Sequence, residues 1–222
     1  MPDADPAASD GFLHIDVADL SMAEAHRLLL HCVAPRPIAF TSTIAGDGAA
    51  NLAPFSYFMA GGANPPSIAI SPIMGRGGEP KDTLRNIRTT GEFVVNVVTH
   101  AMRDRMNAAS MALPYGVSEW SRSGFTAAPC RHIRPPRVAE SPLAMECRLF
   151  QVVPHGAGPL AANYVIGEVL AFHVAEAIMP EGVLDPRHVS YIARMGGDWY
   201  ARVDGSTLFE MARSRPASGE ER

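Results

Sequence analysis

The chain has 222 residues, of which 47% are hydrophobic and 19% are charged. These values are ordinary for a globular protein with one substantial core. Its formal net charge of −4 gives no basic surplus, so we expect no binding to nucleic acid. The three cysteines, Cys32, Cys130 and Cys147, are widely spaced and odd in number. This argues against a disulfide framework or a zinc site and fits a reducing cytoplasm.

The sequence shows no targeting or membrane signal. Its acidic first residues lack the apolar core of a secretory signal peptide, and no apolar run approaches the ~20 residues that a membrane-spanning helix needs. We therefore expect a cytoplasmic protein that does not interact with membranes. A single domain is expected over residues 12–212. Flexible termini are expected over 1–11 and 213–222, which are rich in Pro, Ala, Ser, Gly and charged residues.

The first helix has the clearest start signal. Ser21 and Glu24 form a capping-box pattern, which predicts an amphipathic helix up to about Cys32. Pro35 and Pro37 then stop helical structure. Further short helices are expected at 82–90, 100–112 and 185–194.

Strands are predicted wherever β-branched and apolar residues alternate between turn residues. In chain order we expect strands at 38–44, 50–58, 67–71, 92–98, 143–153, 163–177 and 199–203. A long excursion rich in Pro, Ser and Gly occupies 113–142. Hairpin connections with few, short helices predict a mainly β antiparallel barrel with helical decoration, because a doubly wound sheet would alternate strands and helices regularly.

Motifs of several enzyme classes are absent from the sequence. It contains no Walker loop, no Gly-x-Gly-x-x-Gly that opens a helix after a strand, no Gly-x-Ser-x-Gly and no His-Glu-x-x-His. The eight histidines are scattered. Hydrolases and metalloenzymes therefore find no support, and we expect no catalytic acid, base or nucleophile and no metal ligand.

The strongest binding signal lies at Lys81, Asp82 and Thr83. Lys81 is the only lysine in the chain, and the tripeptide follows the Gly-rich loop 75–78. A helix N-terminus presents unpaired N–H groups and a partial positive charge, which suit a phosphate. The ammonium and hydroxyl groups can add hydrogen bonds. An ordinary solvated helix start would show the same three residues.

Two neighbouring strand segments add weaker signals. Asn51–Phe58 is rich in aromatic and small residues, and its Pro54 removes a strand donor. Such a stretch offers the apolar wall and few polar groups that a flavin ring requires, although a core strand broken by proline would look alike. Thr41, Ser42 and Thr43 carry hydroxyls that could reach a phosphate or ribityl chain, or be ordinary strand residues.

Taken in order, these segments resemble the flavin reductase-like, FMN-binding split-barrel family. The resemblance covers about residues 20–203, and although no single motif is decisive, their common order argues against coincidence. The matching segments are Pro35–Thr43, Asn51–Phe58, Pro65-Pro66 before a strand, Lys81–Asn86, Glu92–Asn96 and Arg194–Tyr200.

The resemblance implies a six-stranded antiparallel split β-barrel that forms a homodimer with FMN near the subunit interface. By this resemblance, the phosphate and ribityl chain would be contacted by Ser42, Thr43, Lys81 and Thr83. The ring would be lined by Asn51, Ala53, Phe55 and Ser56, and the loop would be supported by Asn86. Arg194 and Tyr200 are weaker candidates near the nicotinamide or the partner subunit, and 113–142 is expected to cover the flavin as a lid or substrate-selecting loop. The cofactor-binding set is Thr41, Ser42, Thr43, Asn51, Ala53, Pro54, Phe55, Ser56, Lys81, Asp82, Thr83 and Asn86.

The activity implied by the resemblance is that of an NAD(P)H:flavin reductase. It would supply reduced flavin or electrons to a partner monooxygenase or another acceptor. Hydride transfer from NADH or NADPH needs stacked rings and a polarised flavin edge, and no acid or base from the protein. The alternative is a flavoredoxin-like FMN electron carrier without direct NAD(P)H turnover. A third reading is a split-barrel protein that binds haem or no cofactor.

Overall fold

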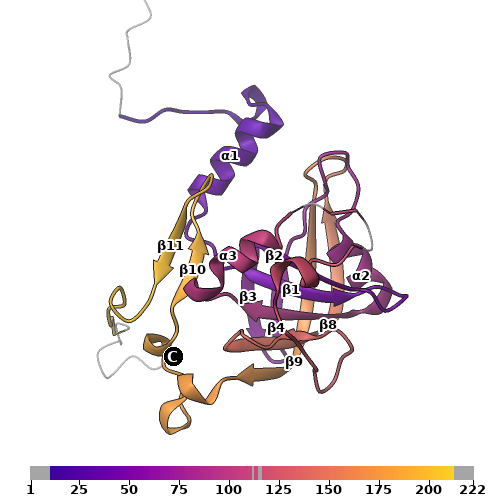
Figure 1. Cartoon of the computed structure of the whole chain (residues 1–222). Helices are drawn as coiled ribbons and strands as arrows, with labels where there is room; N and C mark the ends of the chain where they lie inside the picture. Colours follow the sequence, from indigo (N-terminus) through magenta and orange to yellow (C-terminus); the bar gives the residue numbers. More distant parts are fainter. Residues whose placement is uncertain (1–10, 112, 115–116, 213–222) are drawn as a thin grey trace, which may run out of the picture.

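The computed structural model describes residues 11–111, 113–114 and 117–212. The expected flexible termini, 1–11 and 213–222, lie outside this part of the chain apart from Gly11. The described residues form a seven-stranded antiparallel sheet that curves into a barrel (Figure 1), in the order β2-β1-β5-β8-β9-β4-β3. Its strands are β1 (Ala39–Ile44), β2 (Ala50–Phe55), β3 (Phe58–Ala63), β4 (Pro66–Ile70), β5 (Glu92–Val97), β8 (Leu143–His155) and β9 (Ala162–Val174).

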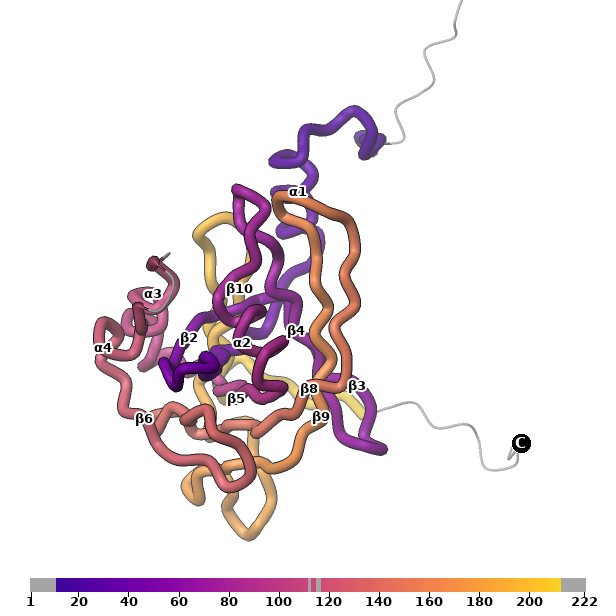
Figure 2. The backbone as a smooth tube through the Cα atoms, turned by 90° about the vertical axis from the view of Figure 1, so that its right-hand side faces the viewer, coloured from indigo at the N-terminus to yellow at the C-terminus, as the bar shows by residue number. Residues whose placement is uncertain are grey.

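The longest hairpin joins β8 and β9, which run side by side along one flank of the barrel (Figure 2). Its register shifts twice, between Glu146 and Cys147 and between Leu149 and Gln151. Such bulges increase the local twist and help a long hairpin to follow a curved sheet.

Helix α1 (Met22–Cys32) starts at the predicted capping box, where Glu24 N donates to Ser21 Oγ and Ser21 N donates to Glu24 Oε2. None of its residues is buried, and it projects from the barrel beside the hairpin of β10 (Tyr191–Arg194) and β11 (Tyr200–Val203) (Figure 1). The Arg36 guanidinium donates to carbonyls at the end of α1 and to Met195 O at 2.8 Å. This contact ties α1 to the hairpin.

Helix α2 (Asp82–Thr90) forms where the sequence predicted a short helix, and it packs against the barrel. Leu84 and Ile87 are buried with apolar residues of β1, β4, β5, β8 and β9. Gly91 ends the helix in the left-handed region at φ 72°, which favours glycine. In the same core Gly167 makes room for Phe93, because a Cβ there would lie 2.4 Å from the ring.

A second core lies between β1–β2 and the segments that follow β5. It contains Phe40 and Leu52 from the sheet, Met106 from α3 and Trp120 from α4. The remaining elements are α3 (Arg103–Ala108), α4 (Trp120–Ser123), β6 (Ala127–Ala128), β7 (Arg137–Val138) and short 3-10 turns at Val17–Asp19, His100–Met102, Glu176–Ile178, Pro180–Gly182 and Pro186–His188.

Two sequence predictions were wrong in detail. The strand expected at 50–58 is two strands, because the chain leaves the sheet after Phe55 and returns as β3. This turn adds a seventh strand, and its Gly-rich sequence gives little β signal. The helix expected at 185–194 is a 3-10 turn followed by β10, whose four residues pair with β11. A strand of four residues is too short to show a clear alternation of apolar and polar residues.

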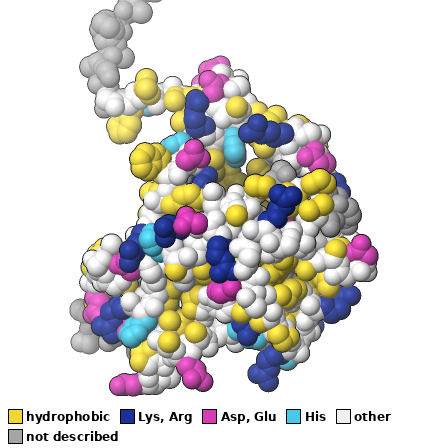
Figure 3. Space-filling view, viewed as in Figure 1, with side chains coloured by type: hydrophobic (Ala, Val, Ile, Leu, Met, Phe, Trp, Pro, Cys, Tyr) yellow, Lys and Arg dark blue, Asp and Glu magenta, His cyan; other side chains and the backbone are white. Residues whose placement is uncertain are grey.

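Basic and acidic side chains are interspersed on the face shown in Figure 3, with apolar side chains between them. No helix among the described residues is long and apolar enough to cross a membrane.

Candidate functional site

A cavity of about 300 Å³ opens at the β2 edge of the sheet. It brings together β2, the loop and start of α2, and the residues that follow α3. Its size is at the lower end of the range of small-molecule sites. The wall consists of Asn51, Ala53, Pro54, Phe55, Gly75, Glu79, Pro80, Lys81, Asp82, Thr83, Arg85, Ala109, Ser110, Met111, Leu113 and Glu119.

Buried hydrogen bonds fix this wall. Thr83 Oγ1 donates to Asn51 Oδ1 at 2.9 Å and joins the first turn of α2 to β2. Asn86 Nδ2 donates to Thr43 Oγ1 at 3.0 Å, and Thr43 Oγ1 in turn donates to Asn51 Oδ1 at 3.4 Å. Thr43 and Asn51 are register partners, so their side chains share one face of the sheet. All four side chains are buried, and each positions the next.

Glu119 completes the network from the 113–142 excursion. Its Oε2 accepts from Asn51 Nδ2 at 2.8 Å and from Leu52 N at 3.1 Å. Burial raises the pKa of the Glu119 carboxyl, the bonds from Leu52 and Asn51 oppose this rise, and the charge of Asp82 adds to it. Sequence reasoning missed Glu119, because it lies in an aperiodic segment 68 residues from Asn51.

The start of α2 presents hydrogen-bond donors to the cavity. Lys81 is the N-cap residue, and its side chain makes no capping hydrogen bond. The first N–H groups of α2 are therefore not capped by the Lys81 side chain. Uncapped N–H groups at the start of a helix attract anions. The Lys81 side chain is exposed at the rim, whereas Thr83 is buried behind it.

Charge in the wall is mixed. Lys81 and Arg85 share it with Glu79, Asp82 and Glu119. Burial raises the pKa of Asp82, and the charges of Arg85 and Lys81 act in the opposite direction. The donors that suit an anion are therefore local to the start of α2, and the rest of the wall does not attract one.

The structure brings many of the predicted cofactor residues into one wall and leaves others outside it. Asn51, Ala53, Pro54, Phe55, Lys81, Asp82 and Thr83 line the cavity.

The other predicted residues do not line it. Thr41, Thr43 and Asn86 are buried behind it. Ser42 is next to Thr43 on β1, so it points to the opposite face, and its Oγ is buried without a partner among the described residues. Ser56 follows β2 and accepts from Arg36 Nε at 3.5 Å.

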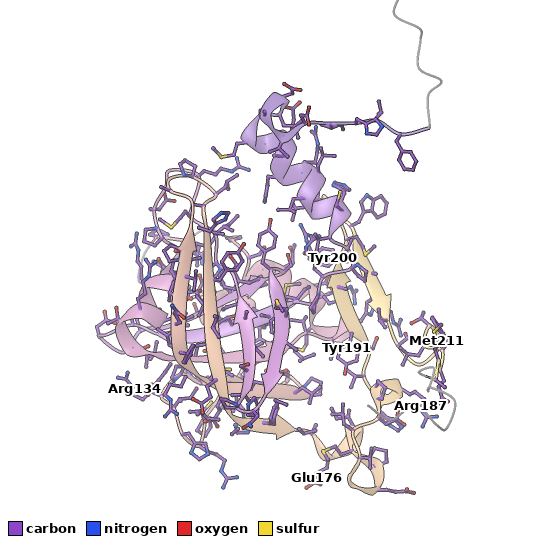
Figure 4. All side chains as sticks on the ribbon, turned by 180° about the vertical axis from the view of Figure 1, so that it is seen from behind. Arg134, Glu176, Arg187, Tyr191, Tyr200 and Met211 are labelled. Carbon is purple, nitrogen blue, oxygen red and sulfur yellow. The ribbon has the colours of Figure 1, made fainter. Side chains whose placement is uncertain are left out.

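Arg194 and Tyr200 lie together on the β10–β11 hairpin, where Figure 4 labels Tyr200. The Arg194 guanidinium stacks over the Tyr200 ring at 4.6 Å and also donates to Gly197 O at 2.7 Å. Both residues line a different cavity of about 410 Å³, together with basic and acidic side chains of α3 and β11. The two cavities share no lining residue.

Most of the 113–142 excursion packs against the barrel. Trp120, Phe125 and Val138 are part of the second core, and Val138 N donates to Asn96 Oδ1 at 2.8 Å. Among its described residues only Leu113 and Glu119 line the cavity. The described part of the excursion therefore contributes one side of the wall through Leu113 and Glu119. A lid over the flavin stays a prediction for this first part of the excursion alone.

The arrangement can hold a small molecule with an anionic end and a flat apolar body. Lys81 and the start of α2 suit the anion, and Ala53, Pro54 and Phe55 form the apolar side. Glu119 and Asn51 are hydrogen-bonded to each other, so they hold the wall together.

Comparison with known proteins assigns the fold and the family. The family model of the flavin reductase like domain matches residues 30–193. The crystal structure of nitrilotriacetate monooxygenase component B from Bacillus cereus is 33% identical with a TM-score of 0.85, covering 91% of this chain and 100% of that one. The crystal structure of 2-nitrobenzoate 2-nitroreductase NbaA from Pseudomonas fluorescens is 29% identical with a TM-score of 0.80, covering 93% of this chain and 100% of that one.

A third structure, a split barrel domain protein from Shewanella frigidimarina NCIMB 400, is 24% identical with a TM-score of 0.75 and covers 93% of this chain and 100% of that one. This likeness confirms the split-barrel class that the sequence predicted. The segment matched by the family model spans most of the described chain, including β2, α2 and the whole wall of the first cavity, and it ends directly before Arg194. The chain therefore belongs to the flavin reductase-like domain family.

Proposed function

We propose that this protein binds FMN non-covalently in the cavity between β2 and α2 and reduces it with NADH or NADPH. One observation carries the proposal: the donors at the start of α2 and the apolar edge of β2 line the same cavity. A ligand with a phosphate at one end and a flat ring at the other fits this division. Membership of the flavin reductase-like family supports the choice of a flavin.

The phosphate end is assigned to Lys81 and the first N–H groups of α2. The Lys81 ammonium is exposed and can move toward a phosphate. The single hydroxyl proton of Thr83 is already donated to Asn51, so Thr83 positions α2 and meets a phosphate only by giving up that bond. Asp82 lines the same end, where its charge favours the nearby lysine.

The ring end is assigned to Ala53, Pro54 and Phe55. Because β2 is an edge strand, the outer side of its backbone faces no neighbouring strand. Glu119 and Ser118 occupy Leu52 N and Ala50 O, and the other outer backbone groups remain for a ligand. These groups can contact the polar edge of a flavin ring. Thr43 and Asn86 support this strand through the buried network. We propose that Thr41, Ser42 and Ser56 affect FMN binding only through the position of β1 and β2.

FMN held by Lys81, the start of α2 and the edge of β2 would supply the hydride-accepting chemistry of the reaction. The protein's part is to bind and orient the two rings and to exclude water between them. No residue of the cavity wall is assigned as an acid, base or nucleophile.

The nicotinamide nucleotide or a second subunit is assigned to the side of Arg194 and Tyr200, whose stacked pair lines the neighbouring cavity. We further propose a homodimer with FMN near the interface. Helix α1 has no buried residue and exposes Met22 and Leu29, and Phe150 on β8 is 73% exposed. A second copy could cover such apolar side chains. A monomer mass, measured by light scattering coupled to size-exclusion chromatography, would contradict the proposed homodimer.

The acceptor of the electrons is proposed to be a partner monooxygenase. The similar structure from Bacillus cereus is a component of a monooxygenase, and this likeness supports the proposal. A small nitroaromatic compound is a second acceptor to test, because the structure from Pseudomonas fluorescens is a nitroreductase.

The test is the visible spectrum of the purified protein with added FMN, followed by oxidation of NADH and NADPH. We expect flavin absorption bands that remain with the protein after gel filtration, and steady turnover with at least one nucleotide. Flavin bands without turnover would leave the flavoredoxin-like electron carrier. If the protein fraction showed no flavin bands after gel filtration, even when FMN had been added in excess, the proposal would be contradicted altogether.

A further inference from the structure

Three side chains capable of binding a metal meet outside the lining of the proposed flavin cavity. They are Cys130 from the 113–142 excursion, Glu146 from β8 and His173 from β9. Their ligand atoms all lie within 4.8 Å of one another. None of the three lines the cavity between β2 and α2. The flavin chemistry therefore does not account for this cluster.

Glu146 is held in place more firmly than an ordinary carboxylate. It is 0% exposed, and its two oxygens accept from Arg131 N at 2.7 Å and His132 N at 2.8 Å. His173 Nε2 lies 2.6 Å from Glu146 Oε1. Because Arg131 and His132 directly follow Cys130, the same two bonds that fix the carboxylate also fix the position of the thiol.

We propose that Cys130, Glu146 and His173 form a binding site for Zn²⁺ or a similar thiophilic divalent ion. Sulfur, imidazole and carboxylate are the ligands that Zn²⁺ prefers. With bond lengths of about 2.0–2.3 Å, neighbouring ligand atoms of a tetrahedral zinc site lie roughly 3–4 Å apart. The ligand atoms of the cluster are 2.6 Å apart for Glu146 and His173 and at most 4.8 Å apart for any pair, so small shifts bring them to that spacing. A thiolate and a carboxylate together also balance the charge of a divalent ion.

Ion binding requires small rearrangements. His173 Nε2 must exchange its contact with Glu146 for the ion, which moves the two atoms apart by less than about 1 Å. Arg131 and His132 keep their bonds to Glu146 and act as outer partners that orient the ligand. The His173 side chain is 21% exposed, so water can occupy a fourth position. Arg137 is the neighbouring cation that works against the ion.

The free thiol must lose its proton when the ion binds. Burial and the Glu146 charge raise the pKa of Cys130 to about 12, so the thiol is protonated at neutral pH without an ion. Coordination replaces that proton, as in other thiolate sites. The sequence predicted no zinc site and no metal ligand, because these ligands come from three segments without a short metal-binding spacing.

The test uses the full chain, freed of metal by a chelator and then titrated with Zn²⁺ in a calorimeter. A parallel titration with Co²⁺ follows the near-ultraviolet thiolate-to-cobalt absorption, with FMN-free protein as the reference. We expect one ion per chain and displacement of Co²⁺ by Zn²⁺. Neither measurement uses NADH or NADPH, so a failure here is separate from a failure of the flavin proposal.

Two variants and a matched control locate the ion. Cys130→Ser and His173→Gln should each weaken binding by more than about 100-fold, since loss of an outer partner alone costs about 10–100-fold. Cys32→Ser removes an exposed cysteine on α1 and should leave binding unchanged. Absence of the cobalt–thiolate absorption in the unsubstituted protein would overturn the proposal, whatever the variants do. Equal affinity of Cys130→Ser and the unsubstituted protein would also overturn it.

Discussion

Glu119 and Glu146 are both buried carboxylates that hold the 113–142 excursion to the barrel, yet their surroundings shift their pKa values in opposite directions. Burial alone would raise the pKa of Glu146, but the N–H groups of Arg131 and His132 and the ring of His173 lower it overall. Glu119 receives one backbone N–H and one amide and lies near Asp82, and its pKa is raised.

The comparison shows that the number and kind of donors decide whether a buried carboxylate stabilises the fold. The ordinary pKa of both groups is 4.5. The folded-state pKa of Glu146 is lowered, so its contribution is complete above pH 4.5 and is lost as the pH falls below 4.5 through the lowered value. For Glu119 the folded-state pKa is raised, so its charge opposes folding, increasingly as the pH rises from 4.5 through the raised value.

The largest expected effect on stability is that of Glu146→Gln. The amide can no longer accept from both backbone N–H groups and also face the His173 ring, so a buried donor is left unpaired. We expect a loss of about 3 kcal/mol in the free energy of unfolding at pH 7, measured by urea denaturation. The loss should shrink as the pH falls below 4.5.

Glu140→Gln is the matched control for this change. Glu140 lies in the same excursion and accepts from Thr126 N at 3.1 Å, but its side chain is 30% exposed. Water can replace its lost bonds, so we expect a change of about 1 kcal/mol or less. Similar losses for both variants would show that burial and donor number do not distinguish Glu146.

Glu119→Gln tests the other side of the comparison. At pH 7 the loss of a charge-assisted bond and the relief of a buried charge oppose each other, so we expect a change within about 1–2 kcal/mol. The informative quantity is the pH dependence. As the pH rises from below 4.5 to 7, the free energy of unfolding of the variant should increase relative to that of the unsubstituted protein. A relative change in the opposite direction would mean that the pKa of Glu119 is not raised.

Thr83→Val removes a single buried hydrogen bond from the cavity network. Valine keeps the shape of threonine but removes the donor at 2.9 Å from Asn51 Oδ1, which keeps only the longer bond from Thr43 Oγ1 at 3.4 Å. We expect a loss of about 1 kcal/mol in stability, and Thr83→Ser should restore most of it. Thermal unfolding measures both. If Thr83→Val were as stable as the unsubstituted protein, Asn51 would not depend on α2 for its position.

Local patterns predicted the elements whose signals are contained in a few residues. The capping box of Ser21 and Glu24, the helix at Asp82–Thr90 and the strand at Glu92–Val97 were all confirmed. By contrast β10 depends on pairing with β11, and β3 has a Gly-rich sequence. Neither contains a local signal strong enough to set its type.

The site was predictable to the extent that it depends on chain segments with recognisable composition. Pro54 on β2 and Lys81 before α2 lie in one wall, as expected. Glu119 and the Cys130–Glu146–His173 cluster could not be predicted, because each depends on contacts between residues far apart in the sequence. From the sequence, Ser42 was predicted to contact the cofactor, but its position on β1 directs its side chain to the face opposite Thr43.

Lys81→Ala should have the smallest effect on stability, within about 0.5 kcal/mol, because the side chain is exposed and caps nothing. It therefore gives the most direct test of FMN binding in this cavity. Fluorescence titration should show that FMN binding weakens by about 1–3 kcal/mol, whereas riboflavin, which lacks the phosphate, binds the variant as it binds the unsubstituted protein. Equal losses for the two ligands, or no loss for FMN, would contradict the placement of the phosphate at Lys81.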